Sequence, residues 1–173
     1  MNLIDCTLAQ QGEQILAILN HAIVNSTALY DYQPRTIDNM TAWFAAKQAG
    51  DFPVLGAMAA NGDLMGFASY GSFRAFPAYK YTVEHSVYVH HDYRGQGLSK
   101  TLMQALIQRA EVQGKHVMVG AIDAANDVSL KLHEQLGFTR VGTMPQVGFK
   151  FGRWLDLALV QRVLSTPLNP IDG

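Results

Sequence analysis

The chain contains 173 residues, of which 13 are basic and 14 acidic, so its formal net charge is −1. A general nucleic-acid binder is usually basic, so this balance argues against that class. No apolar run approaches the roughly 18 residues of a membrane span, and we expect no membrane partner. A single cysteine, Cys6, excludes an internal disulfide and fits a reducing compartment. Because Asp5 comes too early for a signal peptide, we expect a cytoplasmic protein.

Length and composition fit one globular domain. A chain of this size can bury a core large enough to fold alone. Its 49% hydrophobic and 16% charged residues are an ordinary mixture. Residues 165–173 contain two prolines and no hydrophobic period. We therefore expect a single domain over residues 1–164 and a loose C-terminal tail over residues 165–173.

The first half of the chain predicts a strand, two helices and a hairpin, in that order. A short strand is expected over residues 3–7, and a helical period of apolar residues starts at Leu8. Asp38 is the expected N-cap of the second helix, which ends at Gly50. Strands over residues 53–60 and 65–73 follow. The Asn61-Gly62-Asp63 sequence between them favours a hairpin turn.

The second half alternates strands and helices. β-branched residues predict a strand over residues 82–89, and apolar residues at every fourth position predict a helix over residues 97–113. A buried strand over residues 116–122 is followed by a helix that Asn126 caps and Gly137 stops. Strands over residues 138–143 and 149–160 complete the pattern. This order indicates an α/β fold with a mixed sheet, antiparallel in its meander and parallel where a helix crosses over.

The most informative stretch joins the strand that ends near Val89 to the helix that follows. It reads Arg94-Gly95-Gln96-Gly97-Leu98-Ser99-Lys100. A glycine-bearing turn directly before a helix collects backbone N–H groups at the positive end of the helix dipole, which favours a phosphate or pyrophosphate. The spacing fits neither a Walker loop nor a dinucleotide fingerprint. An ordinary strand-to-helix turn is the alternative interpretation.

Two polar side chains lie inside otherwise apolar elements. A buried carboxylate is costly, so Glu84 in the predicted strand is either a solvated edge residue or a functional group. His133 shares one sector of the predicted helix with Asn126 and Ser129. The apolar stripe beside that sector consists of Val128, Leu132 and Leu136. We expect His133 to face a cleft from the edge of that stripe. A lone histidine of this kind is more often a structural hydrogen-bonding group than a catalyst, and both readings stay open.

The run His90-His91-Asp92 raises the question of a metal site. Adjacent residues on a strand point to opposite faces of the sheet, and the sequence shows no second group of ligands. We therefore expect no metal.

Together these features resemble the GNAT acetyltransferase superfamily, from the first strand to about Val160. The acetyl-CoA signature of that superfamily has glutamine or arginine at its first position, glycine at its fourth, and glycine or alanine at its sixth, with any residue between them. Arg94 and Gly97 match it, while Ser99 departs at the last position by one hydroxyl. Within the superfamily the chain looks like the phosphinothricin or methionine sulfoximine N-acetyltransferases. That likeness rests on residues 73–74, 81–89, 132–134, 137–138, 148–150 and 152–154.

The resemblance implies a GNAT-like mixed, mostly antiparallel sheet of about six or seven strands, flanked by helices. A splayed strand pair, the strand of Val87–Val89 and the strand over residues 116–122, would bind acetyl-CoA. The turn would hold the pyrophosphate of the coenzyme, and Asn126 its pantetheine arm. The implied coenzyme-binding residues are Val87, Tyr88, Val89, Arg94, Gly95, Gln96, Gly97, Leu98, Ser99, Lys100, Asn126 and Ser129.

The implied reaction is acetyl transfer to the α-amine of a small amino acid or analogue. Glu84 matches the family position of the general base that deprotonates the amine. His133 stands where many members have a tyrosine that acts as the acid, so it is either that acid or a residue lining the acceptor pocket. The acceptor would contact Phe73, Arg74, Tyr79 and Glu84, with Arg74 pairing its carboxylate. A surface arginine is the alternative for Arg74.

Two other functions stay open at this point. A protein N-terminal or lysine acetyltransferase would use the same chemistry on a larger acceptor. A non-catalytic acyl-CoA-binding module would need the turn but not Glu84. The resemblance also implies a homodimer, with the C-terminal strands as a plausible contact.

Overall fold

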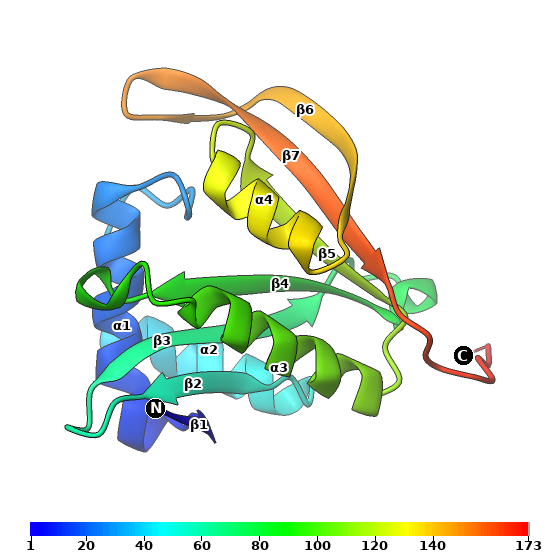
Figure 1. Ribbon diagram of the computed structural model, residues 1–173, viewed down its shortest axis with the longest axis horizontal. Coiled ribbons are helices and arrows are strands. Elements are labelled where there is room, and N and C mark those ends of the chain that lie inside the picture. The colour runs from blue at the N-terminus through cyan, green and yellow to red at the C-terminus, as the bar shows by residue number, and fades with distance from the viewer. Residues whose placement is uncertain (173) are drawn as a thin grey trace. The chain divides into compact units, whose positions relative to one another are not determined.

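The computed structural model describes residues 1–172, and in this part of the chain it shows seven strands and four α-helices (Figure 1). Two 3₁₀ turns, η1 (Pro77–Tyr79) and η2 (His91–Tyr93), flank β4. The elements are β1 (Asn2–Asp5), α1 (Leu8–Asn25), α2 (Ile37–Ala49), β2 (Val54–Met58), β3 (Leu64–Ser72), β4 (Thr82–Val89), α3 (Leu98–Val112), β5 (Val117–Asp123), α4 (Asp127–Gln135), β6 (Thr139–Lys150) and β7 (Arg153–Val163).

The strands are hydrogen-bonded in the order β1-β2-β3-β4-β5-β7-β6. β4 and β5 pair in parallel, whereas β1–β2, β2–β3, β5–β7 and β6–β7 are antiparallel pairs. The mixed, mostly antiparallel sheet expected from the sequence is thereby confirmed. Within residues 1–172, no helix is both long enough and apolar enough to cross a membrane.

Contacts within the chain divide it into two compact units, and we describe each by itself. The first unit contains residues 1–70 and 86–106. The second contains residues 71–85 and the chain from Ile107 onward. Along β4, the chain leaves the second unit after His85 and enters the first at Ser86.

The first unit packs α1 and α2 against one face of β2 and β3 (Figure 1). The apolar residues of α1 recur at intervals of three and four, which puts them on the inward side of the helix. Burying such side chains stabilises the unit by roughly 1.5–3 kcal/mol for each large one. The buried members of this core are Cys6, Ile15, Ile18, Leu19, Met40, Val54, Leu64 and Phe67.

Cys6 is a buried free thiol in this core, with 9% of its surface exposed. Burial, and after it the neighbouring Asp5 carboxylate, raises the pKa of Cys6 to about 12. A Cβ on Gly56 of β2 would stand 2.4 Å from the Cys6 sulfur, so glycine at that position makes room for the thiol.

The N-cap of the second helix lies two residues before the expected one. Thr36, not Asp38, is the N-cap of α2: its hydroxyl accepts a hydrogen bond from the Asn39 N–H at 3.3 Å. The Asn39 side chain accepts in return from the Thr36 N–H at 2.8 Å. This reciprocal capping satisfies two N–H groups of the helix end, which Asp38 alone would not do. Asp38 lies in the first turn, where its charge suits the helix dipole.

The C-terminal hairpin belongs to the second unit and differs from the expected pair of short strands. β6 continues from Thr139 to Lys150, and register shifts on β6 between Arg140 and Gly142 and between Met144 and Gly148 absorb its irregular stretches. The turn lies at Phe151 and Gly152, which have φ angles of 52° and 72°. Two successive positive φ angles are typical of a tight hairpin turn. The strand expected over residues 149–160 is confirmed from Arg153 onward, and its start was wrong because that part contains this turn.

The C-terminal tail makes specific contacts in the second unit. The Thr166 hydroxyl donates to the Lys115 carbonyl, and the Thr166 carbonyl lies 2.7 Å from His116 Nδ1. The Ile171 N–H donates to the Tyr81 hydroxyl oxygen at 3.1 Å. These contacts involve single residues, and the looseness expected over residues 165–173 stays a prediction.

Candidate active site

The glycine-bearing turn of the sequence lies in the first unit, between η2 and α3. Gly95 and Gly97 have φ angles of 77° and 76°, a region that a side chain disfavours. A Cβ on either glycine would meet no atom within 4 Å, so glycine is required by the backbone conformation and not by space. α3 begins at Leu98, and the first N–H groups of a helix have no partner within it. The turn therefore has the geometry of an anion site.

Residues 86–89 of β4 approach β3 closely in the same unit. A Cβ on Gly66 of β3 would stand 2.8 Å from the Tyr88 carbonyl oxygen and 3.2 Å from Val89 Cα, so glycine allows this approach. The Tyr88 ring lies against Phe67, with 5.4 Å between ring centroids. Desolvation raises the pKa of Tyr88 to about 12. Residues 86–89 of β4 can therefore contact a ligand through their backbone N–H and C=O groups.

Glu84 lies in the second unit on the three-residue parallel ladder between β4 and β5. Thr82, Val83 and Glu84 stand opposite Val117, Met118 and Val119. Glu84 is the last residue of this register and is half-buried. Because side chains alternate along a strand, Glu84 and His85 point to opposite faces of β4.

The turn between β5 and α4 is stabilised by its own side chains. The Asn126 side-chain oxygen accepts from the Ser129 N–H at 3.1 Å, which confirms Asn126 as the N-cap. Asp123 accepts from the Ala125 N–H at 3.0 Å, and its other oxygen lies 3.5 Å from the Arg153 guanidinium. Since its oxygen serves the cap, Asn126 offers a ligand its amide N–H₂ group, and Ser129 offers its hydroxyl.

His133 is buried and does not lie at the edge of an apolar stripe. Only 1% of its surface is exposed, whereas Val128, expected in that stripe, is 82% exposed. Leu136, directly after α4, is buried and Leu132 is half-buried, as expected for the stripe. Val128 was assigned to the wrong side, because this nine-residue helix has too few apolar residues to define its orientation.

His85 is the residue of this site that the sequence did not reveal. Its Nε2 lies 3.1 Å from His133 Nε2, and the two rings stack with 4.9 Å between centroids. His133 Nδ1 in turn lies 2.7 Å from the Ser129 carbonyl oxygen. His85 Nδ1 is buried and has no hydrogen-bond partner among the described residues. In the sequence, the one indication of its role is its position on the same face of β4 as the apolar Val83 and Val87.

The surroundings of the two histidines shift both pKa values downward. Burial, and after it the nearby His133, lowers the pKa of His85 to about 3. Burial also lowers the pKa of His133, and the hydrogen bond to Ser129 opposes that shift. The Phe138 ring stands edge-on to both imidazoles, at 5.4 and 5.1 Å between centroids. The pair is therefore held in an apolar environment that favours its neutral form.

Gly120 of β5 provides the space that the His85 ring occupies. A Cβ at this position would stand 2.7 Å from His85 Nε2 and 2.9 Å from Val160 Cγ2. The backbone of Gly120 has no positive φ. Glycine is needed at this position because of the close contact with the imidazole.

The residues expected to bind the acceptor lie together on the loop before β4, in the second unit. The Arg74 guanidinium stacks on the Phe73 ring at 4.3 Å and donates to the Phe73 carbonyl at 3.0 Å. Phe73 and Tyr79 meet edge to face at 5.6 Å. Arg74 is exposed, as are Phe76 and Tyr79, at 75% and 42%. The loop therefore presents a cation on an aromatic surface that is accessible in this structure.

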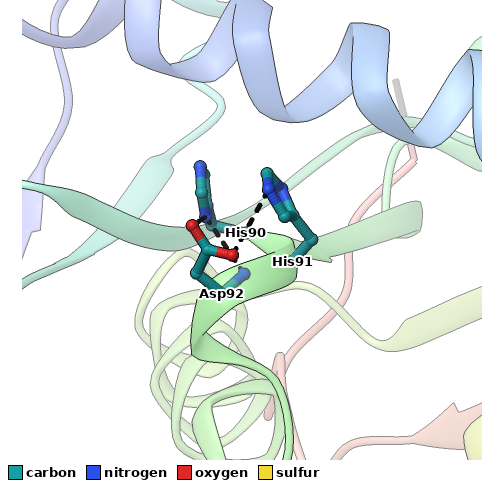
Figure 2. A group of neighbouring side chains, drawn as sticks. All are labelled: His90, His91 and Asp92. Carbon is teal, nitrogen blue, oxygen red and sulfur yellow. Dashed lines mark hydrogen bonds and ion pairs between the residues drawn. The ribbon is translucent and has the colours of Figure 1, made fainter.

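His90, His91 and Asp92 lie side by side at the surface of the first unit (Figure 2). β4 ends at Val89 and η2 follows, so the expectation that His90 and His91 alternate along a strand was wrong. Carboxylate oxygens of Asp92 lie 3.4 Å from His91 Nε2 and 3.9 Å from His90 Nδ1 (Figure 2). His21 stacks on His91 at 4.2 Å. His90 Nδ1 accepts a hydrogen bond from the Asp92 N–H at 3.3 Å, and His91 lies nearer to the Asp92 carboxylate. These contacts account for the proximity, and we assign no metal.

Comparison with known proteins gives the class of this protein. Residues 17–138 match the acetyltransferase (GNAT) family. An L-methionine sulfoximine/L-methionine sulfone acetyltransferase of Pseudomonas paraeruginosa (strain DSM 24068 / PA7) is 52% identical over 147 residues, which cover 85% of this chain and 86% of the relative.

Two solved structures extend the comparison to the fold. A protein from Acinetobacter baylyi ADP1 is 60% identical with a TM-score of 0.98, covering 99% of this chain and 96% of that one. A GNAT superfamily phosphinothricin acetyltransferase from Sinorhizobium meliloti, in complex with acetyl-CoA, is 33% identical with a TM-score of 0.93 and covers 99% and 94%.

This chain belongs to the GNAT acetyltransferase family, and it is an N-acetyltransferase. The resemblance inferred from its sequence motifs is thus confirmed, both for the superfamily and for its likeness to the methionine sulfoximine and phosphinothricin enzymes.

Proposed function

We propose that this enzyme transfers the acetyl group of acetyl-CoA to the α-amine of a small amino acid or analogue, of the methionine sulfoximine or phosphinothricin type. The observation that carries the proposal is 52% identity, over 85% of this chain, to a relative named for methionine sulfoximine and methionine sulfone. The Sinorhizobium meliloti relative, named for phosphinothricin and solved with acetyl-CoA, supports the donor and the acceptor class.

The turn of the first unit fits the pyrophosphate of the coenzyme. Gly95 and Gly97 leave open space where a side chain would otherwise stand, and α3 begins directly after them. We assign the pyrophosphate to the backbone N–H groups of Gly95 to Lys100, with Arg94 and Lys100 adding positive charge. Ser99 keeps its N–H available, so its hydroxyl does not remove a contact. The pantetheine arm would pair with backbone groups of Val87–Val89.

Glu84 is the proposed general base. An aliphatic amine is mostly protonated near neutral pH and cannot attack a carbonyl carbon until it loses a proton. The half-buried carboxylate of Glu84 would take that proton directly or through one water. The amine nitrogen then forms a bond to the carbonyl carbon, which gives a tetrahedral intermediate with a negative oxygen. As this intermediate collapses, the carbon–sulfur bond breaks, and the CoA thiolate leaves and takes up the remaining extra proton of the nitrogen. Backbone N–H groups near Val89 would stabilise the negative charge that develops on the carbonyl oxygen.

Two residues at the start of α4, in the second unit, are also assigned to the coenzyme. We assign the Asn126 amide and the Ser129 hydroxyl to the pantetheine arm, which is consistent with the exposure of Asn126 and the partial exposure of Ser129 at the start of the helix. For His133, the two alternatives were an acid that protonates the leaving thiolate and a residue lining the acceptor pocket. Its 1% exposure and its two nitrogen contacts favour a role exerted through His85.

The loop of Phe73, Arg74 and Tyr79 is the proposed site of the acceptor carboxylate. The guanidinium of Arg74 is exposed and already oriented by the Phe73 ring and carbonyl. A guanidinium pairs with a carboxylate through two parallel hydrogen bonds, which would select amino acids over simple amines.

The test is a thiol-release assay with acetyl-CoA and a panel of acceptors. The panel contains methionine sulfoximine, methionine sulfone and phosphinothricin, their decarboxylated amines, and short peptides. We expect turnover on the amino-acid analogues and a loss of at least tenfold in kcat/KM on the decarboxylated amines. Measured acetyl-CoA binding without turnover of any small amine would reject the proposal and leave the acyl-CoA-binding module.

A peptide acceptor is a second candidate, because the acceptor loop is open in this structure. Phe76 and Tyr79 are 75% and 42% exposed, as an extended chain would need. Competition between methionine sulfoximine and a peptide with a free N-terminus decides between them. A peptide that is acetylated with the higher kcat/KM would replace the small acceptor.

We also propose that the enzyme is a cytoplasmic homodimer. Large apolar side chains of the β6–β7 hairpin, each 47–59% exposed, support a contact with a second copy. They are Val141, Met144, Val147, Phe149, Phe151 and Trp154. Light scattering on the wild type and on Trp154→Glu tests this: a monomeric wild type would reject the dimer. The single reduced cysteine is consistent with the cytoplasm.

A further inference from the structure

The direction of the hydrogen bonds in the His85–His133 pair follows from one chemical fact: a backbone carbonyl oxygen only accepts. The Ser129 carbonyl lies 2.7 Å from His133 Nδ1, so that nitrogen carries a proton. In a neutral imidazole the other nitrogen, His133 Nε2, then holds a lone pair. Its contact at 3.1 Å therefore requires a donor, and His85 carries its proton on Nε2. The lone pair of a neutral His85 is left on Nδ1.

We propose that His85 is a further functional residue of the site, that His133 positions it, and that the neutral pair accepts a hydrogen bond from the bound molecules through His85 Nδ1. Every N–H of the neutral pair is engaged within the second unit, by the Ser129 carbonyl or by His133 itself. A neutral His133 therefore has no proton to give to a leaving thiolate. The catalytic meaning of this inference rests on the proposed function, whereas the direction of the hydrogen bonds does not.

The position of His85 Nδ1 supports this assignment. The atom is buried and has no hydrogen-bond partner among the residues that the structure describes. A buried acceptor without a partner costs roughly 1–3 kcal/mol, so a donor that met it would be bound favourably. Groups of this type in a bound molecule include an ammonium, an amide N–H or a hydroxyl. On the face of β4 opposite Glu84, His85 would contact a part of the bound molecules that Glu84 does not.

The surroundings of the pair hold it neutral and in place. Gly120 and Val160 lie beside His85, and Phe138 stands edge-on to both rings. None of these three residues titrates. The polar group next to His133, on the side away from His85, is the carbonyl of Ser129. Burial disfavours a charged imidazole in such surroundings, in agreement with the lowered pKa values of both histidines. A pair that is neutral near pH 7 keeps the hydrogen-bond direction derived above.

A direct test reads the tautomers in the wild-type enzyme. Histidine labelled with ¹⁵N shows in two-bond proton–nitrogen spectra which ring nitrogen carries the proton, and His133→Gln and His85→Gln assign the signals. We expect His133 as the Nδ1–H form and His85 as the Nε2–H form at pH 7.5. A proton on His133 Nε2 would overturn the proposal. Because this test needs no turnover, it stands even if none of the acceptors is acetylated.

Kinetics of matched variants test whether His85 and His133 act together in the reaction. We expect His85→Leu and His133→Leu each to lower kcat/KM by at least tenfold, and the double variant to lose no more than the larger single loss, since both act as one unit. His133→Gln should recover part of the loss, because its side-chain oxygen can accept from His85 Nε2.

Two outcomes would contradict this proposal. Full activity of His85→Leu beside an inactive His133→Leu would make His133 the direct acid. Additive losses in the double variant would show that the residues act separately. Thermal melting of each variant controls for folding, and a variant that does not fold leaves the decision to the wild-type spectra.

Discussion

The glycine turn of the first unit and the histidine pair of the second differ in how they present polar groups. The turn is exposed and acts through its backbone, because Gly95 and Gly97 adopt φ angles that other residues avoid. The pair joins the buried His133 to the half-buried His85 and acts through side chains that lie 48 positions apart in the sequence. A backbone site can be recognised from a short motif, whereas a side-chain site of this kind exists only once the fold brings two strands and a helix together. The following predictions test that contrast.

The largest effect is expected at the proposed base. Glu84→Gln keeps the size of the side chain and removes its ability to take a proton. A general base typically contributes about 10²–10⁴-fold, so kcat should fall by at least about 10²-fold. The acetyl-CoA affinity, measured by calorimetry, should stay unchanged. An unaltered kcat would remove Glu84 from the mechanism.

The next effect concerns the space for the His85 ring. Gly120→Ala places a methyl group 2.7 Å from His85 Nε2, and overpacking of this kind costs about 1–3 kcal/mol of unfolding free energy. Urea unfolding measures it. Gly142→Ala is the matched control, since a Cβ there meets no atom within 4 Å. Adding His85→Ala to Gly120→Ala should recover part of the loss; a double variant no more stable than Gly120→Ala would contradict the steric explanation.

The buried pair also predicts how stability depends on pH. Unfolded His85 titrates near 6.5, and in the folded state its pKa is about 3. The unfolded chain therefore binds the proton first, so the stabilisation is complete above pH 6.5 and is lost as pH falls toward about 3. Between pH 7 and pH 5 this amounts to about 2 kcal/mol. His85→Gln should flatten the pH dependence of urea unfolding by that amount; an unchanged slope would show that His85 does not titrate this way.

A change in the turn is expected to affect binding more than folding. Gly97→Ala adds a methyl group in open space, so its effect reports only the φ angle of 76°. A non-glycine residue in this region costs roughly 1–2 kcal/mol, and the empty turn of the variant should relax to avoid it. Binding must then restore the angle, so the Kd for acetyl-CoA should rise about tenfold. Gly142→Ala again serves as the control, because no positive φ is involved there. Equal Kd values for both variants would mean that the turn tolerates a side chain.

The smallest effect is expected at the position that departs from the family signature. Ser99→Ala and Ser99→Gly restore the residues common in the family, and both leave the backbone N–H in place. We expect the Kd for acetyl-CoA to change by less than about threefold, or roughly 0.7 kcal/mol. A larger change in either variant would show that the hydroxyl contacts the coenzyme.

The sequence sufficed for most features that depend on neighbouring residues. The strand over residues 82–89, the cap at Asn126 and the turn at Gly95 and Gly97 were all recognised from local patterns, and the structure confirms them. The Thr36 cap was missed because Asp38, two residues later, also suits the first turn of a helix.

What the sequence could not reveal depends on distant contacts. The orientation of α4 is set by packing and not by its few apolar residues, so Val128 was assigned to the wrong side. His85 could not be linked to His133 without the fold, and neither could Gly120, whose backbone conformation is ordinary. The bulged course of β6 likewise depends on its register with β7.

The single cysteine has a practical consequence for measuring the reaction. Acetyl transfer releases one free thiol per turnover, and a chromogenic disulfide reports thiols only as they become thiolates. Cys6 is buried with a pKa of about 12, so the native enzyme should add no signal of its own. The same reagent also reports the rate of unfolding, because the Cys6 thiol reacts only after the core around it unfolds. Product formation and enzyme integrity can thus be followed in one cuvette through the same chemistry.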